Sequence, residues 1–287
     1  MKFITYDVEH GSCHVLRVPN QNEDVFMFDA GSKEDFSPAL HLKDAWGISS
    51  LRWLAISHLD SDHITDISNV DLICPNDCPV ALDYPKVSDE ILLASHGGEI
   101  PATIEVFKEF SKRFVRPVPD IDDPGYFWGG VKFARFKNNE EDFDDINNLS
   151  QVTFIDYVGT TILLPGDLEK PGWMKLLEKP DFIDWLQSTD ILVASHHGRD
   201  SGFCSEVFDN ETGKCKPIIT IFSDKSIVDS SVPEKYRAVT QGMWCTKGDG
   251  SRYPRRVLTT RSDGAILVDV SSSGVLNVKY GFDYSTE

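Results

Sequence analysis

Long apolar runs are missing from this sequence of 287 residues. No stretch approaches the about 20 consecutive apolar residues that a membrane-spanning helix needs. Residues 1–8 meet an acidic side chain, Asp7, too early to form the apolar core of a secretory signal peptide, and they are more typical of a first β-strand. We therefore expect a cytoplasmic protein with no membrane segment.

Cysteine is also scarce, with six residues in the whole chain. This number is too small for a disulfide scaffold in a chain of this length. Cys74 and Cys78 have a loose zinc-like spacing, but no second Cys/His pair stands at a fitting distance. We expect the cysteines to be reduced and partly buried.

Positive charge is the third deficit. The sequence has 28 Lys and Arg against 46 Asp and Glu, which gives a formal net charge of −18. Such a surface repels polyanions, because affinity for nucleic acid depends on neutralising phosphates with basic side chains. A nucleic-acid role therefore requires a local basic patch, bound metal ions or a partner protein that recruits the nucleic acid. Phosphodiester chemistry is not excluded, because metal ions reverse the local field.

What the sequence does contain is a series of short apolar strands. Strands are predicted at residues 2–8, 13–18, 25–29, 51–57, 131–136, 151–158, 160–165, 190–195, 218–222, 256–260, 265–270 and 275–280. Helices are predicted at residues 38–47, 89–96, 101–114, 173–178, 182–187 and 233–241. No composition break divides the chain. The pattern predicts one α/β domain over residues 1–287, with two sheets packed face to face and helices outside.

The segment SHLDSDH at residues 57–63 follows the apolar run at 54–56. It places four potential metal ligands, His58, Asp60, Asp62 and His63, in the loop after a buried strand. Histidine nitrogen and carboxylate oxygen together suit zinc or manganese. Alternation along the segment lets the first three of these side chains face one way. The segment therefore predicts a metal site.

Ligand-type side chains recur after other apolar strands. Asp29 ends the strand at 25–29, Asp167 follows the strand at 160–165, and the pair His196-His197 follows the strand at 190–195. A tight turn at residues 11–12 leaves the first strand directly after His10. Strand ends are the places where an α/β scaffold presents its ligands, so a chance arrangement of these groups is hard to sustain.

Together these segments resemble the metallo-β-lactamase fold and, within it, the hydrolase domain of bacterial competence (DNA-uptake channel) proteins. The resemblance rests on VEHGSCHVL, MFDAGS, ISHLDSDHI, NNLSQVTF, ILLPGDLE, LVASHHG and TTRSDGAI, which occur in the family's order over roughly residues 1–270. It implies an αββα sandwich of two mixed β-sheets with flanking helices. With no membrane segment expected, the chain resembles a soluble, stand-alone relative that lacks the channel.

The resemblance also implies two divalent metal ions, zinc or manganese. His58 and Asp60 would hold one metal ion, and Asp62 and His63 would hold the other. Asp167 resembles the carboxylate that bridges the two. These five side chains form the core of the implied ligand set.

The pair His196 and His197 resembles the last ligand and a neighbour that donates a proton or touches substrate. We favour His196 as the ligand and His197 as the proton donor, although the sequence does not separate the two. Asp29 resembles a residue that orients the ligating histidines by hydrogen bonds, as metal sites commonly require.

Three features depart from the family's pattern. The broad family often has a third histidine ligand before the bridging aspartate, whereas no histidine lies between His96 and His196 here. The competence-like branch has an Asn-rich segment in that region, so Asn148 is a possible weak ligand or substrate contact. Residues 65–66 carry an extra charge, and residues 231–233 lack the histidine of that branch.

The resulting hypothesis is a metal-dependent phosphodiesterase or nuclease that acts on single-stranded nucleic acid or a nucleotide. A hydroxide bridging the metals between Asp62 and Asp167 would be the nucleophile, and His197 would be the general acid. Arg199, Lys225 and Lys247 are expected near the rim, where basic side chains can hold phosphate oxygens, although a plain solvated surface charge is the more common role of such a residue. Given the charge of −18, we expect a partner protein to recruit nucleic acid.

Two other functions stay open. Hydrolysis of a small ester, lactone or phosphocholine-type substrate suits the acidic surface better, and a fold alone does not settle chemistry. A non-catalytic interaction module, in which metals only brace the loops, is the third hypothesis. The aromatic residues Phe127, Trp128 and Trp244 can stack a base, but packing in the core or on the surface is the more common role of such residues. The oligomeric state is not encoded in any motif that we recognise.

Overall fold

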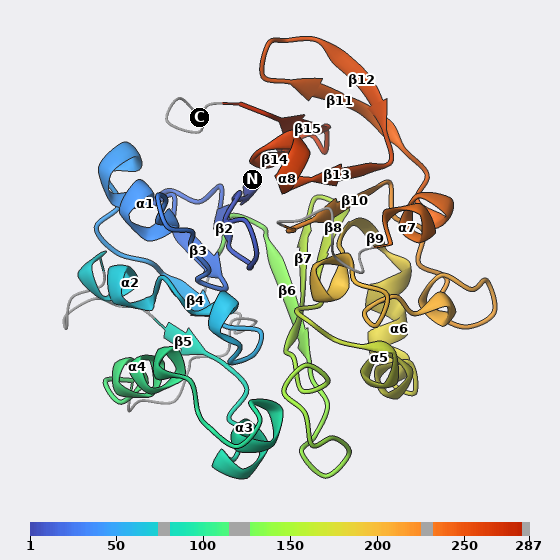
Figure 1. Cartoon of the computed structure of the whole chain (residues 1–287). Helices are drawn as coiled ribbons and strands as arrows, with labels where there is room; N and C mark the ends of the chain where they lie inside the picture. Colours follow the sequence, from blue (N-terminus) through green and yellow to red (C-terminus); the bar gives the residue numbers. More distant parts are fainter. Residues whose placement is uncertain (74–80, 115–126, 225–231, 283–287) are drawn as a thin grey trace.

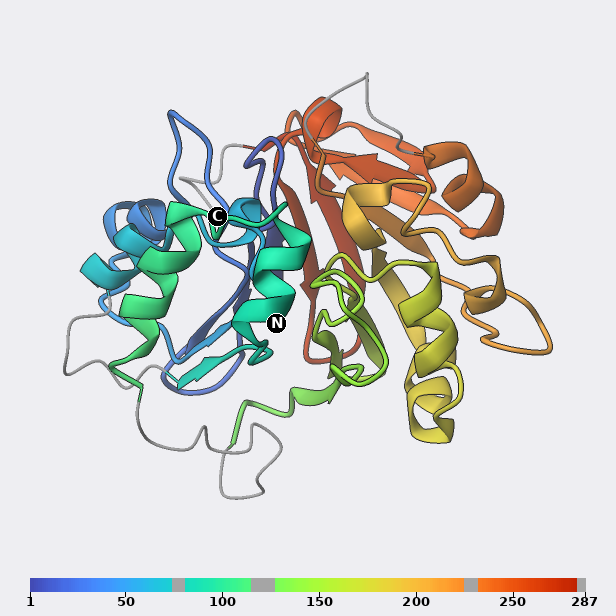
Figure 2. The same cartoon turned by 60° about the horizontal axis from the view of Figure 1, so that its bottom comes forward.

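The computed structural model describes residues 1–73, 81–114, 127–224 and 232–282. Cys74, Cys78 and Lys225 lie outside the described residues, and the expectations for them stay predictions. The described part forms two β-sheets that face each other, with helices on both outer sides (Figures 1 and 2). No helix in this part is long and apolar enough to cross a membrane.

The larger sheet has the strand order β12-β11-β15-β14-β1-β2-β3-β4-β5. Its strands are β1 Lys2–Thr5, β2 His14–Arg17, β3 Val25–Phe28, β4 Trp53–Ala55, β5 Ala81–Asp83, β11 Met243–Lys247, β12 Arg252–Arg255, β14 Ile266–Val270 and β15 Leu276–Tyr280. β3, β4 and β5 run parallel, whereas β1 pairs antiparallel with both β2 and β14. The sheet is therefore mixed.

The smaller sheet has the order β13-β10-β9-β8-β7-β6. Its strands are β6 Lys132–Phe136, β7 Val152–Tyr157, β8 Thr160–Leu164, β9 Thr189–Val193, β10 Ile219–Phe222 and β13 Val257–Thr259. β8, β9, β10 and β13 are parallel, and β6, β7 and β8 are antiparallel. Val158 and Gly159 join β7 to β8 with positive φ angles of 51° and 79°. Two-residue hairpin turns favour such angles because they match the twist of the strands.

The helices are divided between the two outer faces (Figure 2). On one side lie α1 Pro38–Trp46, α2 Ile67–Ile73, α3 Asp89–Ser95 and α4 Ala102–Ser111, and on the other lie α5 Lys170–Leu176, α6 Pro180–Gln187 and α7 Pro233–Val239. The short helix α8 spans Thr260–Asp263, and the 3-10 turns are η1 Ser61–His63, η2 Ser195–Gly198 and η3 Ser205–Val207. The first helix shows why these segments are helical: Ser37 caps it, Pro38 opens it and Gly47 ends it with a left-handed φ of 66°.

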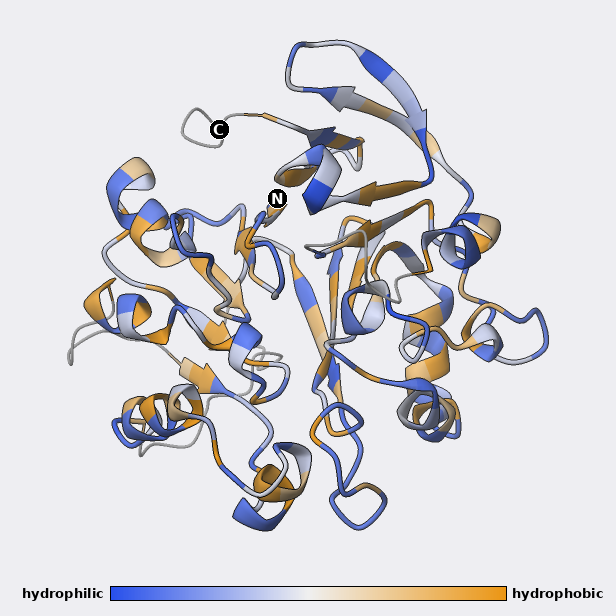
Figure 3. Cartoon of the chain, in the orientation of Figure 1, coloured by the Kyte–Doolittle hydropathy of each residue, from blue (hydrophilic) through white to orange (hydrophobic). Residues whose placement is uncertain are grey.

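The apolar core has three parts, as expected for four layers. Phe26, Trp53, Phe133 and Ile155 belong to a cluster contributed by strands of both sheets. Separate clusters join the larger sheet to α1–α4 and the smaller sheet to α5–α7. In Figure 3 the strands are mainly hydrophobic in colour and many of the connecting loops are hydrophilic.

The architecture confirms the predicted αββα class, with two mixed sheets and flanking helices. The predicted strands and helices overlap observed elements throughout. Sequence reasoning missed α2, α8, β5 and the β11–β12 hairpin. The hairpin was missed because β12 reads Arg-Tyr-Pro-Arg, which has no apolar alternation.

Candidate metal centre

The candidate site is formed by loops that leave the carboxyl ends of parallel strands. β3 and β4 are parallel in one sheet, and β8 and β9 are parallel in the other. The loop after β4 carries residues 58–63, the loop after β8 carries Asp167, and η2 after β9 carries His196 and His197. These loops meet, because Nε2 of His63 lies 3.2 Å from Oδ1 of Asp167.

Backbone contacts hold the loop that carries the first ligands. The N–H of Ala30 donates to the carbonyl of His63 at 2.7 Å. A Cβ built on Gly31 or on Gly11 would lie 2.5 Å from the carbonyl oxygen of Asp62. Glycine is therefore required at both positions, because any side chain would push the loop away.

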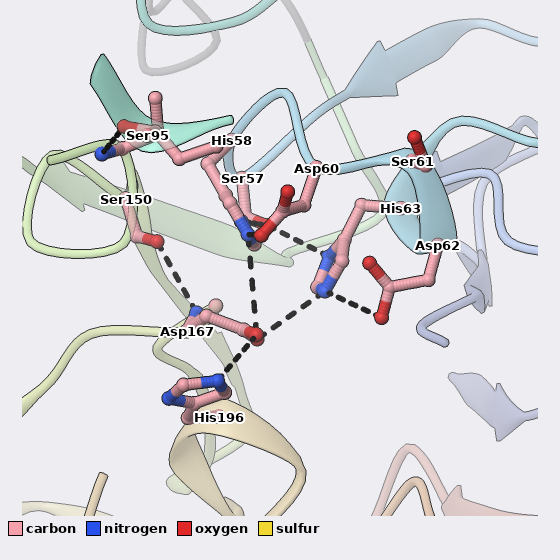
Figure 4. A network of polar contacts seen from close by, with 12 residues as sticks. Ser57, His58, Asp60, Ser61, Asp62, His63, Ser95, Ser150, Asp167 and His196 are labelled. Atoms are coloured by element: carbon pink, nitrogen blue, oxygen red, sulfur yellow. Dashed lines mark hydrogen bonds and ion pairs between the residues drawn. The ribbon is translucent and has the colours of Figure 1, made fainter. Parts of the chain in front are cut away.

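One group of side chains consists of His58, His63 and Asp167, all buried, with their ligand atoms within 4.8 Å of one another. Nε2 of His58 lies 3.9 Å from Oδ2 of Asp167, while His63 faces the other oxygen, Oδ1. Figure 4 shows Asp167 between His58, His63 and His196. The two oxygens of one carboxylate are thus turned toward different histidines.

Asp29 and Ser57 fix the orientation of these histidines. Oδ2 of Asp29 lies 2.9 Å from Nδ1 of His63, and it also accepts a hydrogen bond from the Ser57 hydroxyl. The same hydroxyl lies 3.1 Å from Nδ1 of His58. Both rings therefore direct Nε2 into the site. Carboxylates commonly hold ligating histidines in this way.

A second group consists of His10, Asp62 and His197. Oδ2 of Asp62 lies 3.1 Å from Nε2 of His197 and 3.4 Å from Nε2 of His10. Nδ1 of His197 lies 2.8 Å from the carbonyl oxygen of Ser223, so this nitrogen is the donor and Nε2 faces the carboxylate. The group is adjacent to the first one, since Nε2 of His197 also lies 3.4 Å from Oδ2 of Asp167.

The two neighbouring histidines of η2 point to different surroundings. His196 and His197 both have left-handed φ angles, 51° and 54°, which non-glycine residues seldom adopt. Such strain is concentrated at functional sites, where the surrounding structure maintains it. Nδ1 of His196 is held by Ser201 and Glu169, and its Nε2 lies 3.2 Å from Arg199 and 3.7 Å from Asp167.

The charges of the site are strongly coupled. Burial alone would raise the pKa of Asp167, but the neighbouring His197 and His63 lower it well below its usual range. Burial alone would lower the pKa of His197, whereas the carboxylates of Asp167 and Asp62 raise it to about 10. The pKa of His63 is raised for the same reason, by Asp167, Asp29 and Asp62 against its burial. The carboxylates of Asp29, Asp62 and Asp167 therefore stabilise positive charge at the centre of the site.

Other predicted residues lie at different places around the centre. Oδ2 of Asp60 is 3.6 Å from Nε2 of His58, and its Oδ1 is 3.0 Å from Nε2 of His96. Arg199 lies at the rim, with its guanidinium 3.3 Å from Nε2 of His10. Asn148 is not directed at the site: its side chain donates to Asp145 and accepts from the N–H of Gly172.

Sequence reasoning named no role for His10 or His96. His10 stands in a turn with no second ligand beside it, and its partner Asp62 is supplied by a distant loop. His96 ends α3, where it reads as an ordinary helix terminus. The only signal for His10 was its place at the end of the first strand, because the other groups also follow strands.

The donor set fits a divalent metal ion. Within the described part of the chain, Nε2 of His58 is a buried polar atom with no hydrogen-bond partner. Native structures rarely leave such an atom unsatisfied, and an ion bound at this place is one of the few explanations. His nitrogens and carboxylate oxygens in both groups match the ligands of zinc, manganese and iron.

Comparisons with known proteins find similar solved structures but no matching family model. No protein-family model and no curated protein matches the sequence. Among solved structures, the chain is similar to a diphosphatase of the PhnP family at 13% identity, with a TM-score of 0.49 over 94% of this chain and 98% of that one.

Two other solved structures show similar architecture. The metallo-β-lactamase fold protein YhfI from Bacillus subtilis is 14% identical, with a TM-score of 0.37 over 68% of this chain and 71% of that one. An isothiocyanate hydrolase from Delia radicum gut bacteria is 11% identical, with a TM-score of 0.43 over 92% and 98%. These likenesses do not connect the chain to competence proteins, so that finer resemblance stays a prediction.

Proposed function

We propose that the chain is a metal-dependent hydrolase of phosphate esters whose centre holds two divalent cations, zinc or manganese. The observation that carries this proposal is the position of Asp167. One of its oxygens faces His63, and the other faces His58 and His197. A carboxylate with this arrangement suits the bridge between two cation sites.

The two groups of side chains suggest how the cations would be shared. His58, His63 and Asp167 would hold one cation, and His10, Asp62 and His197 would hold the other, with Asp167 within reach of both. Cations of this kind, when bound, lower the pKa of a water molecule to about 7 and stabilise the charges of a phosphate ester that is being cleaved. This sharing differs from the sequence-based one, which paired His63 with Asp62.

The chain's own residues contribute orientation and charge. Asp29 and Ser57 hold the rings of His58 and His63 so that Nε2 of each faces inward. Arg199, whose guanidinium lies between His10 and His196, would hold a non-bridging phosphate oxygen after a small change of rotamer. This arginine favours a phosphate ester over a neutral ester or lactone.

For the histidine pair we propose roles opposite to those favoured from the sequence. Both nitrogens of His197 are engaged, one by the Ser223 carbonyl and one by the two carboxylates, which suits a ligand. Nδ1 of His196 is held by Glu169 at 3.1 Å, and its Nε2 faces the Arg199 guanidinium at 3.2 Å. His196 would therefore give a proton to the leaving group only once Arg199 has turned to the phosphate.

The substrate class stays the finer part of the proposal. A nuclease acting on single-stranded nucleic acid, or a phosphodiesterase acting on a nucleotide, agrees with Arg199 at the rim. The formal net charge of −18 favours the alternative of a small ester or phosphocholine-type substrate. A module whose metals only brace the loops is disfavoured, because the strained His196-His197 backbone and a complete donor set would have no chemical use.

Elemental analysis combined with paired Mn²⁺ and Zn²⁺ assays tests the proposal. We expect about two cations per chain and hydrolysis of bis(p-nitrophenyl) phosphate. Lactones and carboxyl esters, assayed under the same conditions, should be hydrolysed much more slowly than bis(p-nitrophenyl) phosphate. If the chain binds cations but hydrolyses only carboxyl esters or lactones, the phosphate-ester proposal is wrong and the chain is a hydrolase of small esters. Bound cations without any turnover would support the bracing role, and a chain that binds no cation would refute the centre itself.

A further inference from the structure

The basic side chains of this acidic protein are concentrated in one segment. Residues 235–256 contain six of the 28 Lys and Arg residues but one of the 46 Asp and Glu residues. The segment comprises most of α7 and the whole β11–β12 hairpin. It is therefore a positively charged region on a chain that is otherwise more acidic than its net charge indicates.

The hairpin presents one face to solvent. Trp244 lies opposite Pro254, and Thr246 lies opposite Arg252. Directly opposed residues and those two apart share a face, so these four side chains lie together. Cys245, which points the other way, is fully buried, whereas Trp244 is 58% exposed. The outer face thus carries a large aromatic ring next to an arginine.

A hollow of about 750 Å³ lies between this face and α7. Its lining includes Arg237, Met243, Trp244, Pro254, Arg255 and Arg256. Figure 1 shows the hairpin extending from the end of the larger sheet above α7, and Figure 3 shows β12 mostly in hydrophilic colours.

The two arginines of β12 and Arg256, which follows it, differ in what they already bind. Arg255 pairs with Asp263 and stacks on Tyr280, so it has a structural role. Among the residues that the structure describes, the Arg256 side chain donates only to the carbonyl of Arg237. Arg252 makes no ion pair within the described part of the chain. Arg252 and Arg256 are therefore available to an external anion.

Protection of a sheet edge explains part of this pattern. β12 is an edge strand, and proline and basic residues on an edge prevent pairing with other chains. This explanation accounts for Pro254 and Arg252. It does not account for the exposed Trp244, nor for basic residues in the hollow away from the edge. Stacking platforms flanked by positive charge are typical of single-stranded nucleic-acid binding.

We propose that the outer face of the β11–β12 hairpin binds single-stranded nucleic acid, with Trp244 stacking on a base and Arg252 and Arg256 holding phosphates. The proposal rests on the proposed function, because a phosphodiesterase or nuclease would have nucleic acid as its substrate. It supplies the local basic patch that the net charge of the chain demands, in place of a recruiting partner. A free acidic peptide would satisfy the arginines but not the exposed indole.

The hairpin is separate from the metal centre. In the larger sheet, β12 lies four strands away from β1, the strand that leads to His10. With neighbouring strands about 4.8 Å apart, this separation is on the order of 20 Å. A strand of several nucleotides is needed to reach both places. Binding at the hairpin and hydrolysis at the centre can therefore be measured independently.

The test uses the full wild-type chain in EDTA, which prevents cleavage, with fluorescence anisotropy of a labelled 20-nucleotide oligo-dT as a function of salt. We expect Trp244→Ala to weaken binding by at least about fivefold, as loss of one stacked base does. Arg252→Glu/Arg256→Glu should weaken it further and reduce the salt slope by roughly 1 to 2. Matched controls are Phe127→Ala, which removes a ring that is 76% exposed elsewhere, and Lys112→Glu/Lys170→Glu. They should change affinity by less than about twofold.

Several outcomes would overturn the proposal. Equal losses in the control variants would show non-specific electrostatics, and equally tight, hairpin-dependent binding of poly-glutamate would indicate an acidic protein partner. Concentration-dependent dimerisation lost in Trp244→Ala would indicate a second copy of the chain. Failure of the proposed function is distinguishable: hairpin-dependent oligo-dT binding without bis(p-nitrophenyl) phosphate turnover would keep the docking surface and remove the hydrolase. Turnover of bis(p-nitrophenyl) phosphate without hairpin-dependent oligo-dT binding would keep the hydrolase and remove the docking surface.

Discussion

Nε2 of His63 and Nε2 of His197 lie 3.3 Å apart, although the two residues are separated by 134 positions in the chain. Their rings come from loops of opposite sheets and meet beside the carboxylates of Asp62 and Asp167. Two imidazole nitrogens that face each other at this distance need a proton or a cation between them. The fold therefore brings its ligands together by joining the ends of two different sheets.

Removal of the shared carboxylate should disable both cation sites. We expect Asp167→Ala to lose most of its bound metal and at least about 10³-fold in kcat. The reason is that the Asp167 carboxylate lies 3.9 Å from His58 in the first group of ligands and 3.4 Å from His197 in the second. The fold should be retained, since the three apolar clusters do not involve it. Elemental analysis and circular dichroism check the two statements. Asp184→Ala on the surface of α6 is the control, and unchanged metal content in Asp167→Ala would show that the site is misassigned.

His10 tests whether the second group is a cation site. We expect His10→Ala to lose about one of two cations at limiting metal, with affinity at that site reduced at least about tenfold, as is usual when a metal site loses support. Glu9→Ala is the matched control, because it lies in the same turn and belongs to neither group. Titration with Zn²⁺ by calorimetry reports the two sites separately. Two unchanged binding events in His10→Ala would restrict the centre to His58, His63 and Asp167.

The fold could be predicted from the sequence because its strands are short, apolar and bounded by turns. Asp167 after Leu163-Leu164 illustrates the signal, since a carboxylate at the end of a buried strand has few structural uses. The hairpin β11–β12 gave no such signal, because its strand β12 reads Arg-Tyr-Pro-Arg without apolar alternation and lies at the edge of the sheet.

Finer features of the site depend on contacts that no local pattern encodes. The direction of His196 and His197 is set by left-handed φ angles at two successive residues, which sequence spacing does not reveal. The approach of His10 to Asp62 depends on how the first turn packs against the loop after β4. Asn148 was expected near substrate from a resemblance, and the structure instead shows its amide bound to Asp145 and Gly172. Its assigned role stays a prediction without support from geometry.

The histidine pair can be resolved by substituting each member. We expect His197→Ala to reduce metal content, because Nε2 of His197 lies within 3.4 Å of both Asp62 and Asp167. We expect His196→Ala to keep its metal and to lose about 10²–10⁴-fold in kcat, the usual contribution of a general acid. A substrate with a good leaving group, such as p-nitrophenolate, should lose less than one with an alkoxide leaving group. Metal loss in His196→Ala with full occupancy in His197→Ala would restore the opposite assignment.

His14 should make the stability of the fold depend on pH. Burial lowers the pKa of its ring to about 4 from an ordinary 6.5, with the carboxylate of Asp29 opposing only part of this effect. Between these values the unfolded chain binds a proton that the folded chain does not, so stability is complete above pH 6.5 and is lost as the pH falls toward 4. The loss from this residue alone is about 3 kcal/mol.

Urea unfolding in EDTA at pH 7 and pH 4.5 measures this contribution without interference from metal release. We expect the free energy of unfolding to fall by about 2 to 3 kcal/mol more in the wild-type chain than in His14→Gln. Glutamine can keep the hydrogen bonds that the ring makes with Thr5 and Ser12, and it does not titrate. An equal fall in the two proteins would assign the acid sensitivity to other groups and would show that the ring of His14 accepts its proton in the folded state.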